Sequence, residues 1–312
     1  MKLIKTLLMF SVIVSFLAGC KKDDTTNNTT GPKLIFKYKF DPTQERLGNL
    51  GNPTPLPANH GGQNPVFNAM SAHYIELAQG PLTRLGDGAV LYRAEEVTTG
   101  GSLAIDFEKA KLAKDGEMFY EVPLKNITAG DYEYLRVSLA YQNYDVRLTV
   151  DTTITVAGTP YRIVDSSYCT VASFIGFNTY VKNYKVKNQT ITLNDDKTQG
   201  YWGFEYAANF YGYAYNLLTQ GQAPAGATTV VNPLQSTSPI PAGSCVVTGP
   251  FEGGKLRITG NETKDIVVTV SLSTNKSFEW VEAGTPDGRW EPTKGEVIVD
   301  MGVRGLKPYV QY

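Results

Sequence analysis

The fold class of this chain is decided by residues 34–40, which read LIFKYKF. Leu34, Phe36, Tyr38 and Phe40 fall on one face of an extended strand, because successive side chains of a strand point to opposite faces. The same alternation recurs in four later stretches, at residues 135–141, 146–150, 266–272 and 297–303. Half-buried antiparallel strands produce this pattern. The sequence therefore predicts an all-β domain over residues 34–312, built as an antiparallel β-sandwich that is Ig-like or jelly-roll-like.

Clusters of Gly, Pro, Asn and Asp separate the expected strands, as turns require. Two Pro-rich stretches, Leu50–Asn68 and Gln220–Gly243, are expected to be long loops, which are often functional. The turn at residues 157–160 is a possible boundary between two subdomains. Short helical turns are expected only at Pro42–Leu47 and Phe107–Lys114.

The first twenty residues resemble a bacterial lipoprotein signal. Two lysines precede an apolar run from Leu7 to Ala18, and the run ends in Leu-Ala-Gly-Cys at residues 17–20. The apolar run is too short to span a bilayer core of roughly 30 Å. The resemblance implies that residues 1–19 are removed and that Cys20 carries acyl chains such as palmitate, which anchor the protein in a membrane. An ordinary signal peptide with a chance cysteine is the alternative.

Residues 20–33 contain no apolar side chain after the cysteine, so they are expected to form a flexible tether. The tether begins with Lys22-Asp23-Asp24, which resembles the acidic export signal of surface lipoproteins in the Bacteroidetes. That resemblance implies an outer-membrane protein exposed on the cell surface. The periplasmic leaflet is the alternative location.

Charge and cysteine content narrow the possible partners. The chain carries 29 Lys and Arg against 30 Asp and Glu, so no basic surface is expected to bind nucleic acid. Cys169 and Cys245 remain once Cys20 is lipidated, and an exported protein can join such a pair in a disulfide. Two buried free thiols are the alternative.

An aromatic segment at residues 201–215 is the predicted ligand-binding site. On a strand, Trp202 and Tyr206 face one side and Tyr201 the other, and Gly203 would leave a gap in which a flat ligand could stack. A small molecule, a glycan or an envelope protein are the partners considered, and packing in a core is the competing interpretation. The predicted binding residues are Tyr201, Trp202, Tyr206, Tyr211 and Tyr213.

Two other classes of function are weighed on fewer residues. His60 and His73 are weak candidates for a metal site, since they show no metal-ligand spacing, and Asn194–Asp196 could offer oxygens to calcium. A carbohydrate-active enzyme would need paired carboxylates. Its candidates are Glu205, Glu279 and Glu282. No serine-nucleophile elbow, zinc-protease motif or phosphate-binding loop occurs, so no catalytic residue is assigned.

An ordered series of stretches is similar to the MbnP-like family of copper-associated exported β-proteins. The series comprises residues 34–38, 103–108, 129–139 and 200–205. The resemblance implies an exported β-protein that binds copper, with Trp202 as the position that fits the family's modified tryptophan. His60 and His73 lie outside these stretches, so the resemblance assigns no histidine ligand. A second resemblance, to Bacteroidetes surface lipoproteins of this size, implies no activity.

The sequence therefore favours a lipid-anchored outer-membrane β-sandwich that binds a ligand or a partner without catalysis. It is expected to need no cofactor other than the covalent lipid at Cys20. A copper-binding envelope protein and a carbohydrate-active enzyme are the alternatives.

Overall fold

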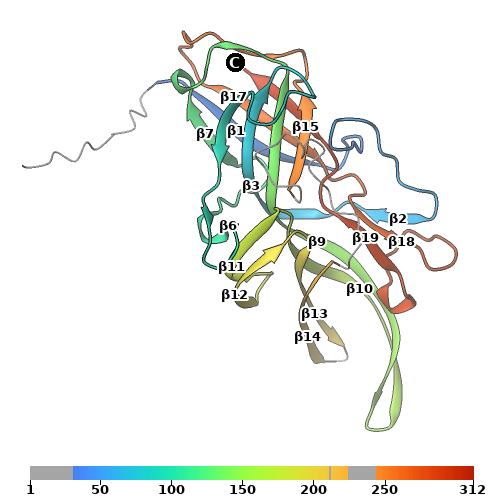
Figure 1. Ribbon diagram of the computed structural model, residues 1–312. Coiled ribbons are helices and arrows are strands. Elements are labelled where there is room, and N and C mark those ends of the chain that lie inside the picture. Colours follow the sequence, from blue (N-terminus) through green and yellow to red (C-terminus); the bar gives the residue numbers. More distant parts are fainter. Residues whose placement is uncertain (1–30, 211, 224–243) are drawn as a thin grey trace, which may run out of the picture. The chain divides into compact units, whose positions relative to one another are not determined.

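Strands dominate the part of the chain that the computed structural model describes, which is residues 31–210, 212–223 and 244–312 (Figure 1). The helical segments in this part are short 3₁₀ turns, namely η1 (Phe107–Lys109), η2 (Leu124–Asn126) and η4 (Pro292–Lys294). The predicted all-β class is confirmed. Of the two expected helical stretches, Phe107–Lys114 shortens to η1, and residues 42–47 form turn and coil instead.

The stretch that predicts the fold class lies in β1 (Lys33–Asp41). Its residues Leu34, Phe36 and Tyr38 are fully buried, as the alternation requires. β1 pairs antiparallel with β7 (Met118–Pro123), and β20 (Leu306–Gln311) completes the sheet in the order β20-β17-β1-β7. β17 (Ile266–Ser273) pairs with β1 in parallel, with Leu34 opposite Ile266. This parallel pair departs from the expected antiparallel arrangement. Parallel strands need a long connection, and here most of the chain lies between the end of β1 and the start of β17.

The largest sheet has the order β14-β13-β10-β9-β3-β4, with β15 also paired to β9. Its strands are β3 (Val66–Ala78), β4 (Ala89–Arg93), β9 (Tyr134–Val156), β10 (Thr159–Phe174), β13 (Tyr201–Phe210), β14 (Tyr213–Gln222) and β15 (Cys245–Pro250). The sheet is strongly curled, and its β9–β10 hairpin extends beyond the other strands (Figure 1).

β9 and β10 form one long hairpin. β9 has 23 residues and joins the stretches 135–141 and 146–150, which the sequence pattern treats as separate strands. Val156 pairs with Thr159 across a two-residue loop in which Ala157 and Gly158 both have positive φ, at 49° and 82°. Such a loop matches the twist of paired strands. Residues 157–160 are thus the tip of a hairpin rather than a linker, and residues 31–312 cluster as one unit.

Three smaller sheets complete the described structure. Their strand orders are β12-β11-β6-β5, β16-β8 and β19-β18-β2. The strands are β2 (His60–Gln63), β5 (Glu96–Val97), β6 (Ala104–Asp106), β8 (Gly130–Tyr132), β11 (Asn178–Lys185), β12 (Thr190–Thr198), β16 (Leu256–Ile258), β18 (Phe278–Val281) and β19 (Val297–Met301).

The predicted loop Leu50–Asn68 is shorter than expected, because β2 and the start of β3 occupy its second half. β2 pairs with β18, which places Gly61 opposite Trp280. A Cβ at Gly61 would collide with the Trp280 indole. Glycine is a poor strand former, but its lack of a side chain lets β2 pack closely against Trp280 here. The other predicted loop, Gln220–Gly243, begins inside β14, and its residues 224–243 lie outside the described part.

One hydrophobic core is shared by the β1 sheet and the largest sheet. Phe36 and Val268 from the first sheet belong to the same buried cluster as Leu77 and Val137 from the second. Tyr38 stacks on Phe119 with ring centroids 3.8 Å apart. The same cluster continues into β9, β10 and β13 through Leu148, Val171 and Tyr206.

The predicted signal, the lipidated Cys20 and the tether as far as Thr30 lie outside the described residues. The last predicted tether residue, Lys33, begins β1, and the Pro32 carbonyl accepts a hydrogen bond from the Leu124 amide at 2.9 Å. Among the described helices, none has the length and apolar character needed to cross a membrane.

Candidate functional site

A cavity of about 830 Å³ lies against one face of the curled large sheet. Four neighbouring strands, β9, β10, β13 and β14, form its first wall, and residues 290–303 form the second. Its volume falls within the range of roughly 300–1,000 Å³ that small-molecule sites occupy. Most of the lining side chains are apolar, so the cavity suits an apolar ligand.

The first wall follows directly from strand alternation, because every second residue of each strand faces the cavity. The lining residues are Gln142, Leu148, Val150, Thr152 and Ile154 of β9, Ile163, Val171 and Ser173 of β10, Trp202, Phe204, Tyr206 and Phe210 of β13, and Tyr215, Leu217 and Thr219 of β14.

Strand register aligns these residues in rows across the sheet. Gln142 is opposite Ser173, which is opposite Trp202, and Trp202 is opposite Gly221. A Cβ at Gly221 would come within 2.7 Å of the Trp202 ring. The glycine therefore gives the indole room to lie across the neighbouring strand, on the cavity side of the sheet.

The second wall comes from the segment that contains η4 and β19, and hydrogen bonds to its backbone carbonyls hold it against β9. The Thr149 amide donates to the Trp290 carbonyl at 2.9 Å, and Gln142 Nε2 donates to the Met301 carbonyl at 3.0 Å. The Trp290 ring packs edge-on against Phe204, with centroids 6.4 Å apart. These contacts join the two walls at both ends of the segment.

The structure divides the five predicted ligand-binding residues. Trp202 and Tyr206 line the cavity, as the alternation predicts. Tyr201 faces the opposite side of β13 and belongs to a separate buried cluster with Phe174 and Tyr184. Tyr213 is 76% exposed and does not line the cavity. Tyr211 lies outside the described residues.

Gly203 does not leave a gap for a ligand, contrary to the sequence-based expectation. A Cβ at this position would collide with the Tyr184 phenol, which already fills the space beside the glycine. Burial raises the pKa of Tyr184, and its ring lies edge-on to Phe174 at 5.2 Å. The glycine therefore serves packing on the face of β13 that points away from the cavity.

Cys169 and Cys245 are free and buried, so the predicted disulfide is not formed. Cys169 pairs with Val146 of β9, whereas Cys245 pairs with Leu139 of the same strand. Seven residues along a strand span roughly 23 Å at about 3.3 Å per residue, while disulfides need Cα atoms within about 7 Å. Burial raises the pKa of each thiol to about 12.

The two histidines are in different places and have different partners. His73 of β3 is buried, and its Nε2 lies 2.9 Å from Glu96 Oε1. His60 of β2 contacts Glu279 through Nδ1. No group of three or more His, Cys, Asp or Glu side chains in the described residues is arranged to hold a metal ion. Asn194–Asp196 lies within β12 rather than in the expected turn.

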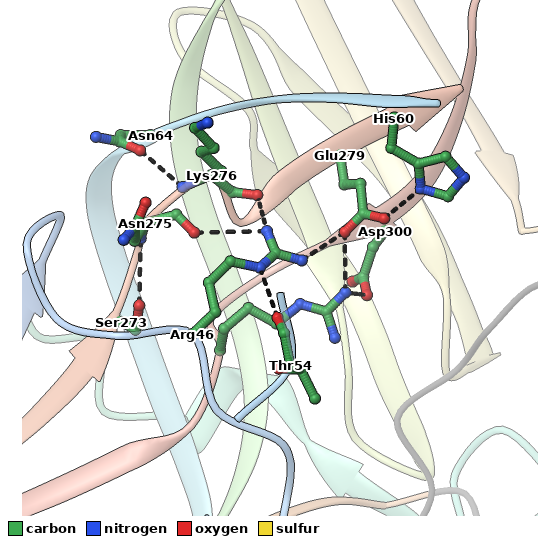
Figure 2. A network of polar contacts seen from close by, with 10 residues as sticks. Arg46, Thr54, His60, Asn64, Ser273, Asn275, Lys276, Glu279 and Asp300 are labelled. Carbon is green, nitrogen blue, oxygen red and sulfur yellow. Dashed lines mark hydrogen bonds and ion pairs between the residues drawn. The ribbon is translucent and has the colours of Figure 1, made fainter. Parts of the chain in front are cut away.

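Glu279 is the centre of a buried polar network next to the second wall (Figure 2). It contacts Arg46 at 2.5 Å, Arg304 at 3.3 Å and also His60. Burial alone would raise the pKa of Glu279, but the hydrogen bonds from His60 and Arg46 outweigh it and lower the pKa. Arg46 also donates to the carbonyls of Thr54 and Lys276. The network thus fastens the loop after β1 to β18.

Glu205 is held by a neighbouring turn. Its carboxylate accepts hydrogen bonds from the backbone amides of Lys187, Asn188 and Gln189, at distances of 2.9 to 3.0 Å. Burial opposes ionisation, yet these bonds outweigh it and lower the pKa of Glu205. Glu205 points away from the cavity, so it does not lie near Glu279 or Glu282 in a shared cleft.

Glu282 is the third predicted carboxylate, and it interacts with Glu296 at the edge of the cavity. Burial raises the pKa of Glu296, and the hydrogen bond with Glu282 raises it further. Glu282 also accepts a hydrogen bond from the Gly288 amide at 3.0 Å. The three carboxylates therefore do not form one catalytic group.

No sequence pattern marks the second wall or Gln142 as part of a site. Residues 297–303 were recognisable as a strand, but nothing in their pattern indicated which face of which sheet they would cover. Comparisons of the chain with protein-family models, with curated proteins and with solved structures find no match.

Proposed function

We propose that this protein is a non-enzymatic binding protein that holds a small apolar ligand in the cavity between the curled sheet and residues 290–303. The observation that supports the proposal is the cavity itself, with a volume of about 830 Å³ and walls formed mainly by aliphatic and aromatic side chains. Such a surface costs free energy when it faces water, at roughly 25 cal/mol per Å². A bound apolar molecule would recover part of that cost.

The proposal places the protein on the outer membrane, anchored by acyl chains at Cys20 and exposed on the cell surface, with the periplasmic leaflet as the alternative. In that setting the anchor would keep the domain beside a source of apolar molecules. The two sheets that share the core would form the predicted sandwich, of Ig-like or jelly-roll-like kind. Radiolabelled palmitate incorporation that is lost in Cys20→Ala would support the anchor, and protease treatment of intact cells would distinguish the two locations.

The described geometry favours binding over the two alternatives. Copper binding needs several soft or imidazole ligands in one place, but His60 and His73 each pair with a separate glutamate. Sugar hydrolysis needs two carboxylates across one bond, whereas Glu205 and Glu279 each satisfy local structural partners.

Binding is tested with N-phenyl-1-naphthylamine, an uncharged apolar dye whose fluorescence rises in apolar surroundings. We expect saturable binding to the full chain, with one site per molecule. Leu217→Glu should weaken that binding at least about tenfold, because it places a charge on the cavity wall. Trp202→Ala should also weaken it, by removing an aromatic contact surface.

The matched control is Asn216→Glu, which adds the same charge on the exposed face of the same strand. It should leave dye binding unchanged. The proposal fails if the folded wild-type protein does not bind the dye, or if Leu217→Glu and Asn216→Glu bind it equally well. If Trp202→Ala unfolds the protein, the residue is mainly a core residue and the Leu217 pair decides.

A further inference from the structure

Two residues that line the cavity carry a buried polar atom without a partner among the described residues, namely Gln142 through Oε1 and Trp290 through Nε1. Gln142 is fully buried on β9 and lines the cavity. Its Nε2 donates to Ser173 Oγ at 2.9 Å and to the Met301 carbonyl at 3.0 Å, while its Oε1 accepts no hydrogen bond from the described residues. The orientation of the amide is fixed by chemistry, since a backbone carbonyl only accepts and must therefore face the nitrogen.

An unpaired buried acceptor destabilises the folded protein and calls for a donor. Gly302 lies beside the amide, where a Cβ would come within 3.1 Å of Gln142 Oε1. A glycine at this position therefore avoids crowding the amide oxygen. A ligand that brought an O–H or N–H group to this end of the cavity would satisfy the oxygen.

The charged groups on the cavity wall restrict the charge that the ligand's head can carry. Among the described lining residues, the carboxyl groups are Glu296 and Asp300, and none is Lys, Arg or His. An anionic head would therefore find no compensating cation among these residues. A cationic head would find Asp300 already paired with Arg304, and Glu296 already sharing a hydrogen bond with Glu282.

We propose that the ligand is an amphiphile with an apolar body and an uncharged head that donates a hydrogen bond, such as an alcohol or a secondary amide. The donor binds Gln142 Oε1, and the apolar body extends along Trp202 and Phe204 between the two walls. This inference rests on the proposed function, because it assigns a ligand class to the same cavity.

The test measures displacement of the naphthylamine dye from the full chain by four molecules with the same ten-carbon chain. These are 1-decanol, decyl methyl ether, decanoate and decylammonium. The alcohol should bind about tenfold more tightly than the ether, which has the same chain but no donor. It should also bind more tightly than either ion.

Variants then assign the preference to Gln142. Gln142→Met keeps the length of the side chain and removes the acceptor, so the advantage of alcohol over ether should fall to less than about threefold. Ser173→Ala is the matched control, because it removes a partner of Nε2 and leaves Oε1 in place, and it should retain the preference. If Gln142→Met does not fold, the four-ligand series on the wild-type protein still decides.

The inference is overturned if the ether, the carboxylate or the ammonium ion binds as well as the alcohol. It is also overturned if the preference survives in folded Gln142→Met. These outcomes leave the proposed function intact as long as the dye binds and Leu217→Glu weakens it. A failure of dye binding itself refutes both.

Discussion

Replacing Glu205 by alanine should lower the free energy of unfolding, although Glu205 does not line the cavity. The carboxylate is buried on β13 and accepts hydrogen bonds from three successive backbone amides of the turn at residues 187–189. A net contribution of about 1 kcal/mol per bond gives a loss of about 3 kcal/mol for the three. Bonds to a charged acceptor are stronger than neutral ones, but the turn is partly exposed, and water replaces part of what is lost.

Urea denaturation at pH 7, followed by tryptophan fluorescence, measures this loss. Glu205→Gln keeps one acceptor oxygen and should lie between wild type and Glu205→Ala. Glu108 provides the control, because it is exposed and its carboxylate forms a surface ion pair with Lys182 at 3.4 Å. Glu108→Ala should change the free energy of unfolding by less than about 1 kcal/mol, as is usual for surface ion pairs.

The pH dependence gives an independent check. The folded pKa of Glu205 is lowered, so its contribution is fully present above the unfolded value near 4.3 and is lost as the pH falls through the folded pKa. The difference between wild type and Glu205→Ala should therefore shrink in acid. A loss below about 1 kcal/mol at pH 7, or a difference that grows in acid, would refute the structural role assigned to this carboxylate.

Three further outcomes are expected. Burial lowers the pKa of His73, so the unfolded state binds the proton more readily than the folded state does. The free energy of unfolding should therefore decline as the pH falls below about 6.5. Unfolding titrations should show a weaker decline in His73→Gln. Cys169 and Cys245 should resist a thiol reagent in the native protein and yield two additional reactive thiols in denaturant, whereas a disulfide would yield none. Gly203→Ala should cost about 1–3 kcal/mol of stability through its collision with Tyr184, and a Tyr184→Ala background should reduce that cost, as a double-mutant cycle in urea would measure.

The fold class could be predicted because alternation is a local property of the backbone. The alternation correctly predicts that Leu34, Phe36 and Tyr38 are buried. That prediction does not depend on which strand pairs with theirs. The parallel partner β17 could not be predicted, since Ile266–Ser273 alternates just as an antiparallel strand would. The length of β9 was missed for a related reason. Its middle, residues 142–145, reads QNYD, which resembles a turn between two strands.

The candidate site was predicted in part. Trp202 and Tyr206 were correctly placed on one face of β13, because their spacing fixes that outcome. Gly203 was misjudged, because a glycine between aromatic residues indicates only that something approaches closely. The group that approaches is Tyr184, on a different sheet. Gln142 carried no local signal at all. Its importance depends on the carbonyl of Met301, more than 150 positions along the chain.

The exposed end of the cavity bears on the length of the ligand. Leu148 and Val150 read as core residues, and a strand pattern cannot tell whether a second sheet or an open cavity lies opposite them. In the structure the same face continues to Ile154, which is 41% exposed, and across the gap Val297 is 62% exposed. Single exposed apolar residues are ordinary, but here two of them continue an apolar cavity toward solvent. Ile154 lies twelve residues beyond Gln142 on β9, roughly 40 Å at about 3.3 Å per residue, so a ten-carbon chain held at Gln142 stops well short of this edge. Chain length is therefore a second variable in the decanol series, and affinity should rise with each added methylene as the chain covers more of the apolar face.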